Sequence, residues 1–148
     1  MKSLFSGRET NTRAWIKWAL LLGAASLFIL SLMLPAARVS DGTDWPGFML
    51  FAIGWIGLGA AIPAWLANIA WVAAGVLIGL NWRGSLWLVI LGWLLAGTAI
   101  PGFDMVGANE ASGGVAHVTV GFWVWILSPM PLLFAEKYRA PNAASVTA

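Results

Sequence analysis

Few side chains in this sequence are suited to chemistry, and the first candidate is His117. It is the only histidine among 148 residues, and the apolar sequence around it predicts a position inside a helix at membrane depth. An ionisable side chain there is a functional candidate, as a pH-sensitive group or a metal ligand. The alternative, which we favour, is a neutral imidazole that hydrogen-bonds across a helix interface. Asn68, expected at a similar depth, is the second candidate polar residue.

The other residue types argue against an enzyme. The sequence has no cysteine, which removes disulfides, thiolate metal sites and thiol nucleophiles. One histidine is too little for a transition-metal site, and haem would lack a second axial histidine or an attachment motif. The serines in apolar segments have no paired base, and no glycine-rich phosphate loop is present. We therefore predict no catalytic residue, cofactor or metal. A membrane enzyme or cofactor carrier would rest on His117 and the carboxylates expected outside: Asp41, Asp44, Asp104 and Glu110.

Composition points to a membrane protein. Hydrophobic residues make up 60% of the chain and charged residues only 9%, with a mean hydropathy of +0.83. Too few charges remain to cover the surface of a water-soluble domain. No basic tract is present that would serve nucleic acid. We therefore expect the lipid bilayer to be the first partner of this chain.

The longest apolar run sets the expected topology. A single helix from Pro46 to Leu80 would be about 53 Å long, more than the ~30 Å hydrocarbon layer, so the run must break, and Pro63 marks the break. The first span should be uncleaved, because Pro35 follows it without a small-x-small cleavage site. We predict one membrane domain over residues 1–148, with a disordered tail at 141–148 and spans at about residues 15–34, 63–80, 85–100 and 113–134.

The segment 47–61 leaves two topologies open, because its fifteen residues are short for a span and long for a loop. If it crosses, five spans divide the basic residues four against four. If it re-enters, with Gly54, Gly57 and Gly59 supplying flexibility, four spans leave only Arg38 opposite the other seven. The positive-inside rule favours four spans with both termini in the cytoplasm. The seven residues on that side are Lys2, Arg8, Arg13, Lys17, Arg83, Lys137 and Arg139.

Small residues should hold these spans together, since helices in lipid associate where backbones approach closely. Each predicted span carries a stripe of small residues at steps of three and four, a spacing that favours left-handed packing. The fourth stripe includes His117. The expected fold class is all-α, with four transmembrane helices in a left-handed bundle and one short re-entrant segment. Its helix-packing glycines are Gly75, Gly79, Gly92 and Gly121.

Three short stretches of the first half resemble a known group of proteins. They are Leu34-Pro35-Ala36, Gly54-Trp55 and Ala64-Trp65-Leu66-Ala67-Asn68. In these stretches the chain is similar to small bacterial four-span inner-membrane proteins whose function is not established. The resemblance implies a bacterial membrane setting and four spans, and it transfers no catalytic residue.

The expected function is therefore non-enzymatic. We expect a bacterial inner-membrane protein that binds another membrane protein or assembles with itself, as an accessory subunit or immunity-type factor. The alternative is a small channel or carrier formed by oligomerisation. In either case the segment 47–61 is the expected interaction or path-lining element, held on the outer side.

Overall fold

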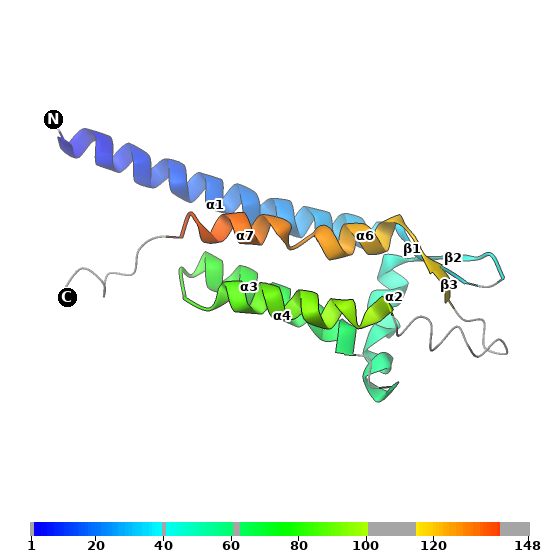
Figure 1. The fold of residues 1–148 in the computed structure, drawn as a ribbon. Coiled ribbons are helices and arrows are strands. Elements are labelled where there is room, and N and C mark those ends of the chain that lie inside the picture. The colour runs from blue at the N-terminus through cyan, green and yellow to red at the C-terminus, as the bar shows by residue number, and fades with distance from the viewer. Residues whose placement is uncertain (1, 40, 61–62, 101–114, 140–148) are drawn as a thin grey trace.

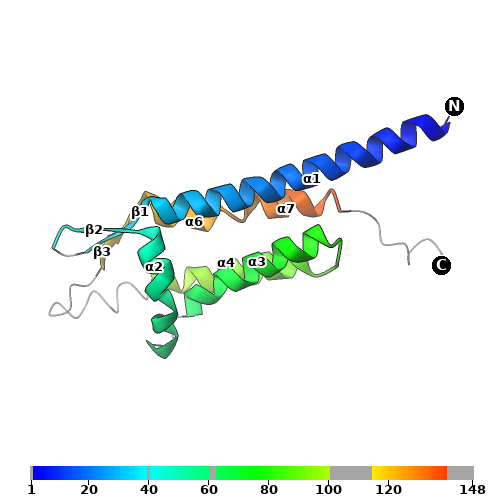
Figure 2. The ribbon, with the colours of Figure 1, turned by 180° about the vertical axis from the view of Figure 1, so that it is seen from behind.

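One long helix organises the structure. The computed structural model describes residues 2–39, 41–60, 63–100 and 115–139. Helix α1 (Lys2–Met33) has 32 residues and runs along the whole assembly of helices (Figures 1 and 2). It ends before Pro35, as expected, because the residue before a proline is disfavoured in a helix.

The remaining helices are short and lie alongside α1. Helices α3 (Leu66–Gly79) and α4 (Ser85–Gly97) form an antiparallel hairpin. Helices α6 (Val120–Leu127) and α7 (Met130–Glu136) follow one another and pack against α1 in the opposite direction. The residues Asn81-Trp82-Arg83-Gly84 predict a tight turn between these two segments. The structure confirms the turn, and its backbone has positive φ at Asn81 (59°) and Gly84 (99°).

A small antiparallel sheet covers one end of the helices. Its strands are β1 (Pro35–Val39), β2 (Asp44–Pro46) and β3 (Val115–Val118), in the order β2-β1-β3. Between α2 and α3 the chain forms two 3-10 helices, η1 (Gly54–Ala60) and η2 (Pro63–Trp65). Helix α2 (Gly47–Ile53) and η1 run roughly across the direction of α1 (Figures 1 and 2).

The prediction of an all-α bundle of four transmembrane helices is wrong. Within the described part of the chain, the only helix long and apolar enough to cross a membrane is Asn11–Met33, a property that a membrane span and a signal sequence share. Helix α3 extends only about 21 Å and α4 about 20 Å, at about 1.5 Å per residue, against the ~30 Å of a hydrocarbon layer. A multi-pass protein is therefore not supported, and the re-entrant segment that completed that scheme is not supported either.

The expected fourth span, residues 113–134, fails for a local reason. Its first part is strand β3, because the β-branched residues there suit an extended backbone and pair with β1. Helix α6 then begins at Val120, and the proline-containing segment after Ser128 starts a separate helix, α7. Pro129 and Pro131 in the sequence predict a kink in this span, and the structure has a full interruption there.

Small residues let the helices approach each other closely. Ala74 and Ile78 on α3 pack with Val89 on α4 and with Leu132 on α7, and all four are buried. A second cluster joins η2 to α6 through Ala64 and Phe122. The core therefore lies between the α3–α4 hairpin and the layer made by α1, α6 and α7.

Candidate functional site

Asn68 lies in the core as a hydrogen-bonding bridge between helices. Its side chain is 7% exposed; Oδ1 accepts a hydrogen bond from Trp125 Nε1 at 2.9 Å, and Nδ2 donates to the carbonyl of Trp65 at 3.0 Å. Two further indole N–H groups reach backbone carbonyls, from Trp71 to Val89 and from Trp93 to Ile126. These bonds connect α3, α4 and α6. Both polar groups of the Asn68 amide therefore serve the fold.

His117 does not lie in a helix and does not meet Asn68. It is exposed on β3, where its Cα pairs with that of Arg38 on β1. Arg38 in turn pairs with Asp44 on β2, and its guanidinium donates to that carboxylate at 2.6 and 2.8 Å. The two pairings place all three residues in one row across the sheet, so the predicted position of His117 at a helix interface is wrong.

Hydrogen bonds lower the pKa of two carboxylates at the sheet end of the molecule. The Arg38 guanidinium lowers the pKa of Asp44, chiefly by hydrogen bonding and further by its charge, to which His117 adds. Hydrogen bonds from Thr43, above all from its backbone N–H at 2.8 Å, lower the pKa of Asp41. Both carboxylates are therefore charged at neutral pH. Asp104 and Glu110, which we expected beside them, lie outside the described residues.

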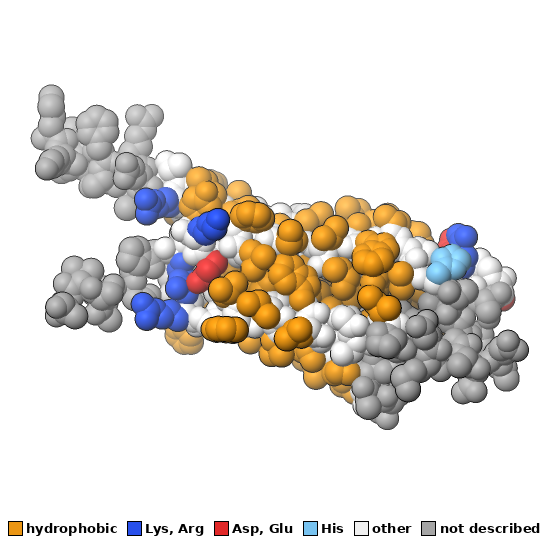
Figure 3. Space-filling model, viewed as in Figure 1, with side chains coloured by type: hydrophobic (Ala, Val, Ile, Leu, Met, Phe, Trp, Pro, Cys, Tyr) orange, Lys and Arg blue, Asp and Glu red, His pale blue; other side chains and the backbone are white. Residues whose placement is uncertain are grey.

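The opposite end of the molecule is basic (Figure 3). Lys17 is 6% exposed there and donates to the Gly79 carbonyl and to Asn81 Oδ1, at 3.3 and 3.0 Å. Its charge therefore satisfies polar groups at the C-terminal end of α3. Arg139 bonds to Glu136 and to the Trp82 carbonyl, and Glu136 accepts a 2.5 Å bond from Ser85. These contacts join the ends of α1, α3, α4 and α7.

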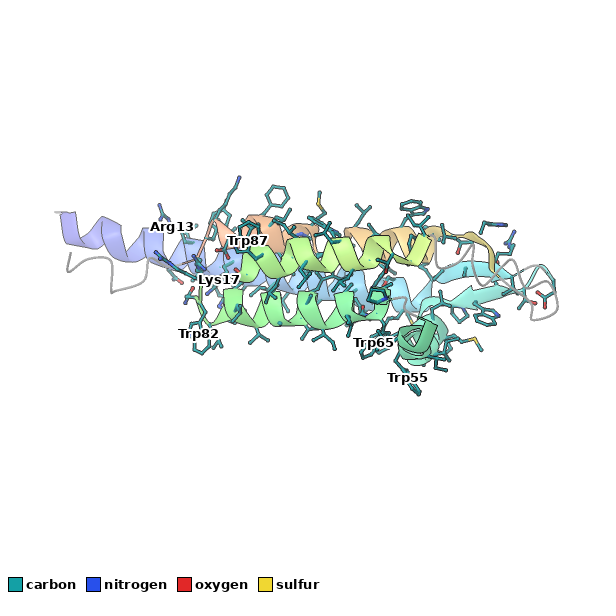
Figure 4. All side chains as sticks on the ribbon, turned by 60° about the horizontal axis from the view of Figure 1, so that its bottom comes forward. Arg13, Lys17, Trp55, Trp65, Trp82 and Trp87 are labelled. Atoms are coloured by element: carbon teal, nitrogen blue, oxygen red, sulfur yellow. The ribbon has the colours of Figure 1, made fainter. Side chains whose placement is uncertain are left out.

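A broad apolar surface separates the basic end from the sheet end (Figure 3). Large side chains on three helices are mostly exposed there, with Leu22 at 67%, Val72 at 63% and Leu94 at 69%. Tryptophans lie toward both margins: Figure 4 places Trp82 and Trp87 at the basic end, and Trp55 and Trp65 toward the sheet end. Tryptophan is the residue type that gathers at membrane–water interfaces. Exposed apolar surfaces of this kind mark sites that contact lipid or another protein.

The segment α2–η1, residues 47–60, is an apolar arm fixed at its base. The Trp65 indole donates to the Phe51 carbonyl at 2.9 Å, and the two rings lie 6.0 Å apart. Gly47 packs against the Ser31 backbone so closely that a Cβ would overlap it. Beyond this base, Trp55 is 58% and Ile56 60% exposed. The inner side of the arm is therefore packed against the rest of the fold, and its outer side exposes large apolar side chains.

The predicted packing glycines fall into two groups. At Gly92 an added Cβ would collide with the Trp71 ring, and at Gly121 it would lie 2.6 Å from the Pro35 carbonyl oxygen. At Gly75 and Gly79 the nearest atoms, on Leu132 and Trp18, would be 4.0 and 3.7 Å away, which is ordinary contact. Of these four positions, Gly92 and Gly121 therefore have no room for a Cβ, Gly92 because of a side-chain ring and Gly121 because of neighbouring backbone.

The three glycines of the segment 47–61 lie in η1. In that 3-10 helix, Gly54 caps the end of α2, and a Cβ on it would approach Trp65 Cδ1 to 3.0 Å. Gly57 and Gly59 follow in the same 3-10 helix. The α-helix therefore gives way to a 3-10 helix at the first of these glycines, ahead of Pro63, where the sequence predicted the break.

A shallow groove of about 400 Å³ runs along the contact between α1 and the α6–α7 pair. Sequence reasoning missed it, although Leu20 and Leu27 stand seven residues apart on α1, as do Leu127 and Phe134 across the α6–α7 break. On α1 that spacing repeats one helix face, and it was the available signal, whereas Leu127 and Phe134 belong to two separate helices. The lining is entirely apolar: Leu20, Leu27, Val124, Leu127, Met130, Pro131 and Phe134.

The described residues offer no metal centre. No group of three or more His, Asp or Glu side chains within them is arranged to hold a metal ion. The structure instead presents three apolar features: the broad exposed surface, the arm at residues 47–60, and the groove between α1 and the α6–α7 pair. Comparison with protein-family models, with curated proteins and with solved structures gave no match for this chain.

Proposed function

We propose that this chain is a bacterial inner-membrane protein, inserted through α1, that acts by binding another membrane protein or a second copy of itself. An accessory subunit or an immunity-type factor would act in this way. The observation that carries the proposal is the exposed apolar surface. Water-soluble monomers rarely expose a continuous apolar patch of more than a few hundred Å². Here exposed apolar side chains extend over α1, α3 and α4 and onto the arm.

The charge distribution supports an orientation. Arg13, Arg83 and Lys137 are exposed and, together with Arg139, belong to the basic end, whereas Arg38 lies in the sheet at the other end. Basic residues near a membrane segment favour the cytoplasmic side. We therefore propose that the N-terminal end of α1, which lies at the basic end, faces the cytoplasm.

The arm at residues 47–60 is the proposed contact with the partner. Its exposed side chains include Phe48, Met49 and Trp55, and aromatic residues and methionine are enriched in protein interfaces. Its base is held by Trp65 and Gly47, so little freedom needs to be lost on binding. The outer side chains, including Trp55 and Ile56, are free of the contacts that fix the base.

The test is co-purification of tagged protein from mild detergent, comparing alanine variants. Trp55→Ala and Ile56→Ala should release the partner while the protein stays in the membrane fraction. Val72→Ala and Leu94→Ala, at equally exposed apolar sites on α3 and α4, serve as matched controls and should retain it. Loss of the partner from all four variants, or from none, would contradict the assignment of the arm.

A further inference from the structure

We propose that the groove between α1 and the α6–α7 pair binds one acyl chain of an anionic phospholipid, whose headgroup is held by Arg13 and Lys137. The proposal concerns a lipid ligand and goes beyond the partner-binding function, although it rests on the same membrane attachment. Three features of the structure support it: the apolar lining of the groove, the cations at its end, and the position or bonding of the other nearby cations away from the groove.

The groove itself fits a hydrocarbon chain. All seven lining side chains are apolar, and the groove follows the helix axes from Leu27 and Val124 to Leu20 and Phe134. Its volume of about 400 Å³ lies within the roughly 300–1,000 Å³ typical of small-ligand sites. With no polar group in the lining, a polar ligand would find no hydrogen-bonding partner there. The occupant must therefore be apolar along its length.

The residues beyond one end of the groove are cationic. The ammonium group of Lys137 lies over the ring of Phe134, 5.9 Å from its centre, and Phe134 lines the groove. On α1, Arg13 precedes Leu20 by seven residues, which is about two turns on the same face and about 10 Å along the axis. Among the residues whose side chains the structure describes, which on α1 begin at residue 11, no carboxylate forms an ion pair with either cation. An anion placed between them would be attracted to both.

The other cations at this end whose side chains the structure describes have different surroundings. Lys17 is buried and bonds to Gly79 and Asn81, and Arg139 is paired with Glu136. Arg83 is exposed in the turn between α3 and α4, away from the elements that line the groove. Arg13 and Lys137 are therefore the cations aligned with the groove, and Arg83 is a control of equal charge at the same end (Figure 4 places Arg13 there).

Lipid titration of the full-length protein tests the proposal. The protein in dodecyl maltoside is titrated with phosphatidylglycerol or phosphatidylcholine, and the rise in thermal unfolding temperature gives an apparent affinity. Phosphatidylglycerol should bind more tightly. Each of Arg13→Gln and Lys137→Gln should weaken its binding about fivefold, from the attraction of one basic side chain to an anionic headgroup. Lys137→Arg should restore it, and Arg83→Gln should leave it unchanged.

Two further measurements test whether binding requires both the acyl chain and the headgroup of the lipid. Met130→Trp, which fills the groove without changing charge, should weaken binding of phosphatidylglycerol at least as much as loss of one cation. Free glycerol 3-phosphate at the same concentration should not stabilise the protein. If Arg83→Gln weakens binding as much as Lys137→Gln, if Met130→Trp has no effect, or if glycerol 3-phosphate stabilises equally, the groove does not hold an anionic lipid.

The outcome is distinguishable from that of the proposed function. If Lys137→Gln does not fold, Arg13→Gln carries the same test of charge. A wild-type protein that retains its protein partner but binds phosphatidylglycerol and phosphatidylcholine equally would overturn the lipid site and leave the partner-binding function intact. A protein that keeps its lipid preference without any partner contradicts the proposed function alone. A second copy cross-linked through Leu127 in the groove would also overturn the lipid site.

Discussion

The substitution Gly92→Ala tests the helix packing at its tightest point. A Cβ at this position on α4 would lie 2.9 Å from Cε2 of Trp71 and closer still to Nε1 and Cδ1 of the same ring. Trp71 is 5% exposed, its N–H donates to the Val89 carbonyl, and its ring packs edge-on against Trp125 at 5.2 Å. The ring therefore has no open space into which to move.

The expected destabilisation combines two effects. Overpacking a core by one methyl group destabilises by about 1–3 kcal/mol, and displacing the indole N–H from its carbonyl adds about 1–3 kcal/mol for a buried unpaired donor. The better helix propensity of alanine offsets about 1 kcal/mol. We therefore expect Gly92→Ala to destabilise by about 1–5 kcal/mol. Gly97, at the end of the same helix, has no atom within 4 Å of an added Cβ, so Gly97→Ala should be neutral or slightly stabilising.

Denaturant unfolding in detergent, followed by tryptophan fluorescence, measures both variants. A Trp71→Leu background should remove most of the Gly92→Ala effect, because the colliding ring is absent, so the two changes should be far from additive. Equal stability of Gly92→Ala and Gly97→Ala, or full additivity with Trp71→Leu, would refute the close packing of Gly92 against the Trp71 ring.

Three further outcomes are expected. Asn68→Leu leaves the Trp125 N–H without its acceptor and should destabilise by about 1–3 kcal/mol in the same unfolding assay, whereas Asn68→Gln should recover part of that loss; equal stability of wild type and Asn68→Leu would contradict the bridge. Because the folded-state pKa of Asp44 is lowered, its pairing with Arg38 stabilises the sheet above a pH of about 4 and is lost as the pH falls through the lowered value. The protection factors of the amide hydrogens in β1 and β2, which correct for the slower intrinsic exchange in acid, should therefore decrease as the pH falls, and Asp44→Asn should abolish the part of that pH dependence due to this carboxylate. His117→Gln should change the free energy of unfolding by no more than about 0.5 kcal/mol, since the side chain is exposed; a larger loss would show that His117 has a packing role.

Hydropathy and local signals predicted part of the fold. Composition predicted the apolar N-terminal helix. The helix-breaking and turn-forming residues Pro and Gly predicted its end before Pro35 and the turn at residues 81–84. The sheet did not follow, because β1 and β3 are separated by more than 70 residues and only tertiary packing brings them together. The β-branched residues at 115–120 were a strand signal that the apolar character of the whole segment concealed.

The same limit applies to the candidate site. The sequence marked Asn68 as a polar group needing a partner in an apolar setting, but its acceptor role toward Trp125, 57 residues later, depends on how α3 and α6 pack. The predicted position of His117 was wrong because a strand replaces the helix expected at that point in the chain. The cationic end of the groove could not be predicted, because Lys137 and Arg13 lie at the same end only when α1 and α7 pack antiparallel.

Photo-cross-linking in intact membranes tests the proposed function most directly. A photoreactive amino acid at Trp55 or Ile56 on the arm is compared with the same probe at Val72 or Leu94, sites of similar exposure on α3 and α4. We predict a defined protein adduct, with another membrane protein or a second copy of this chain, from the two arm positions only. Adducts of equal yield from all four positions, or lipid adducts alone from the arm, would contradict a function based on protein binding through residues 47–60.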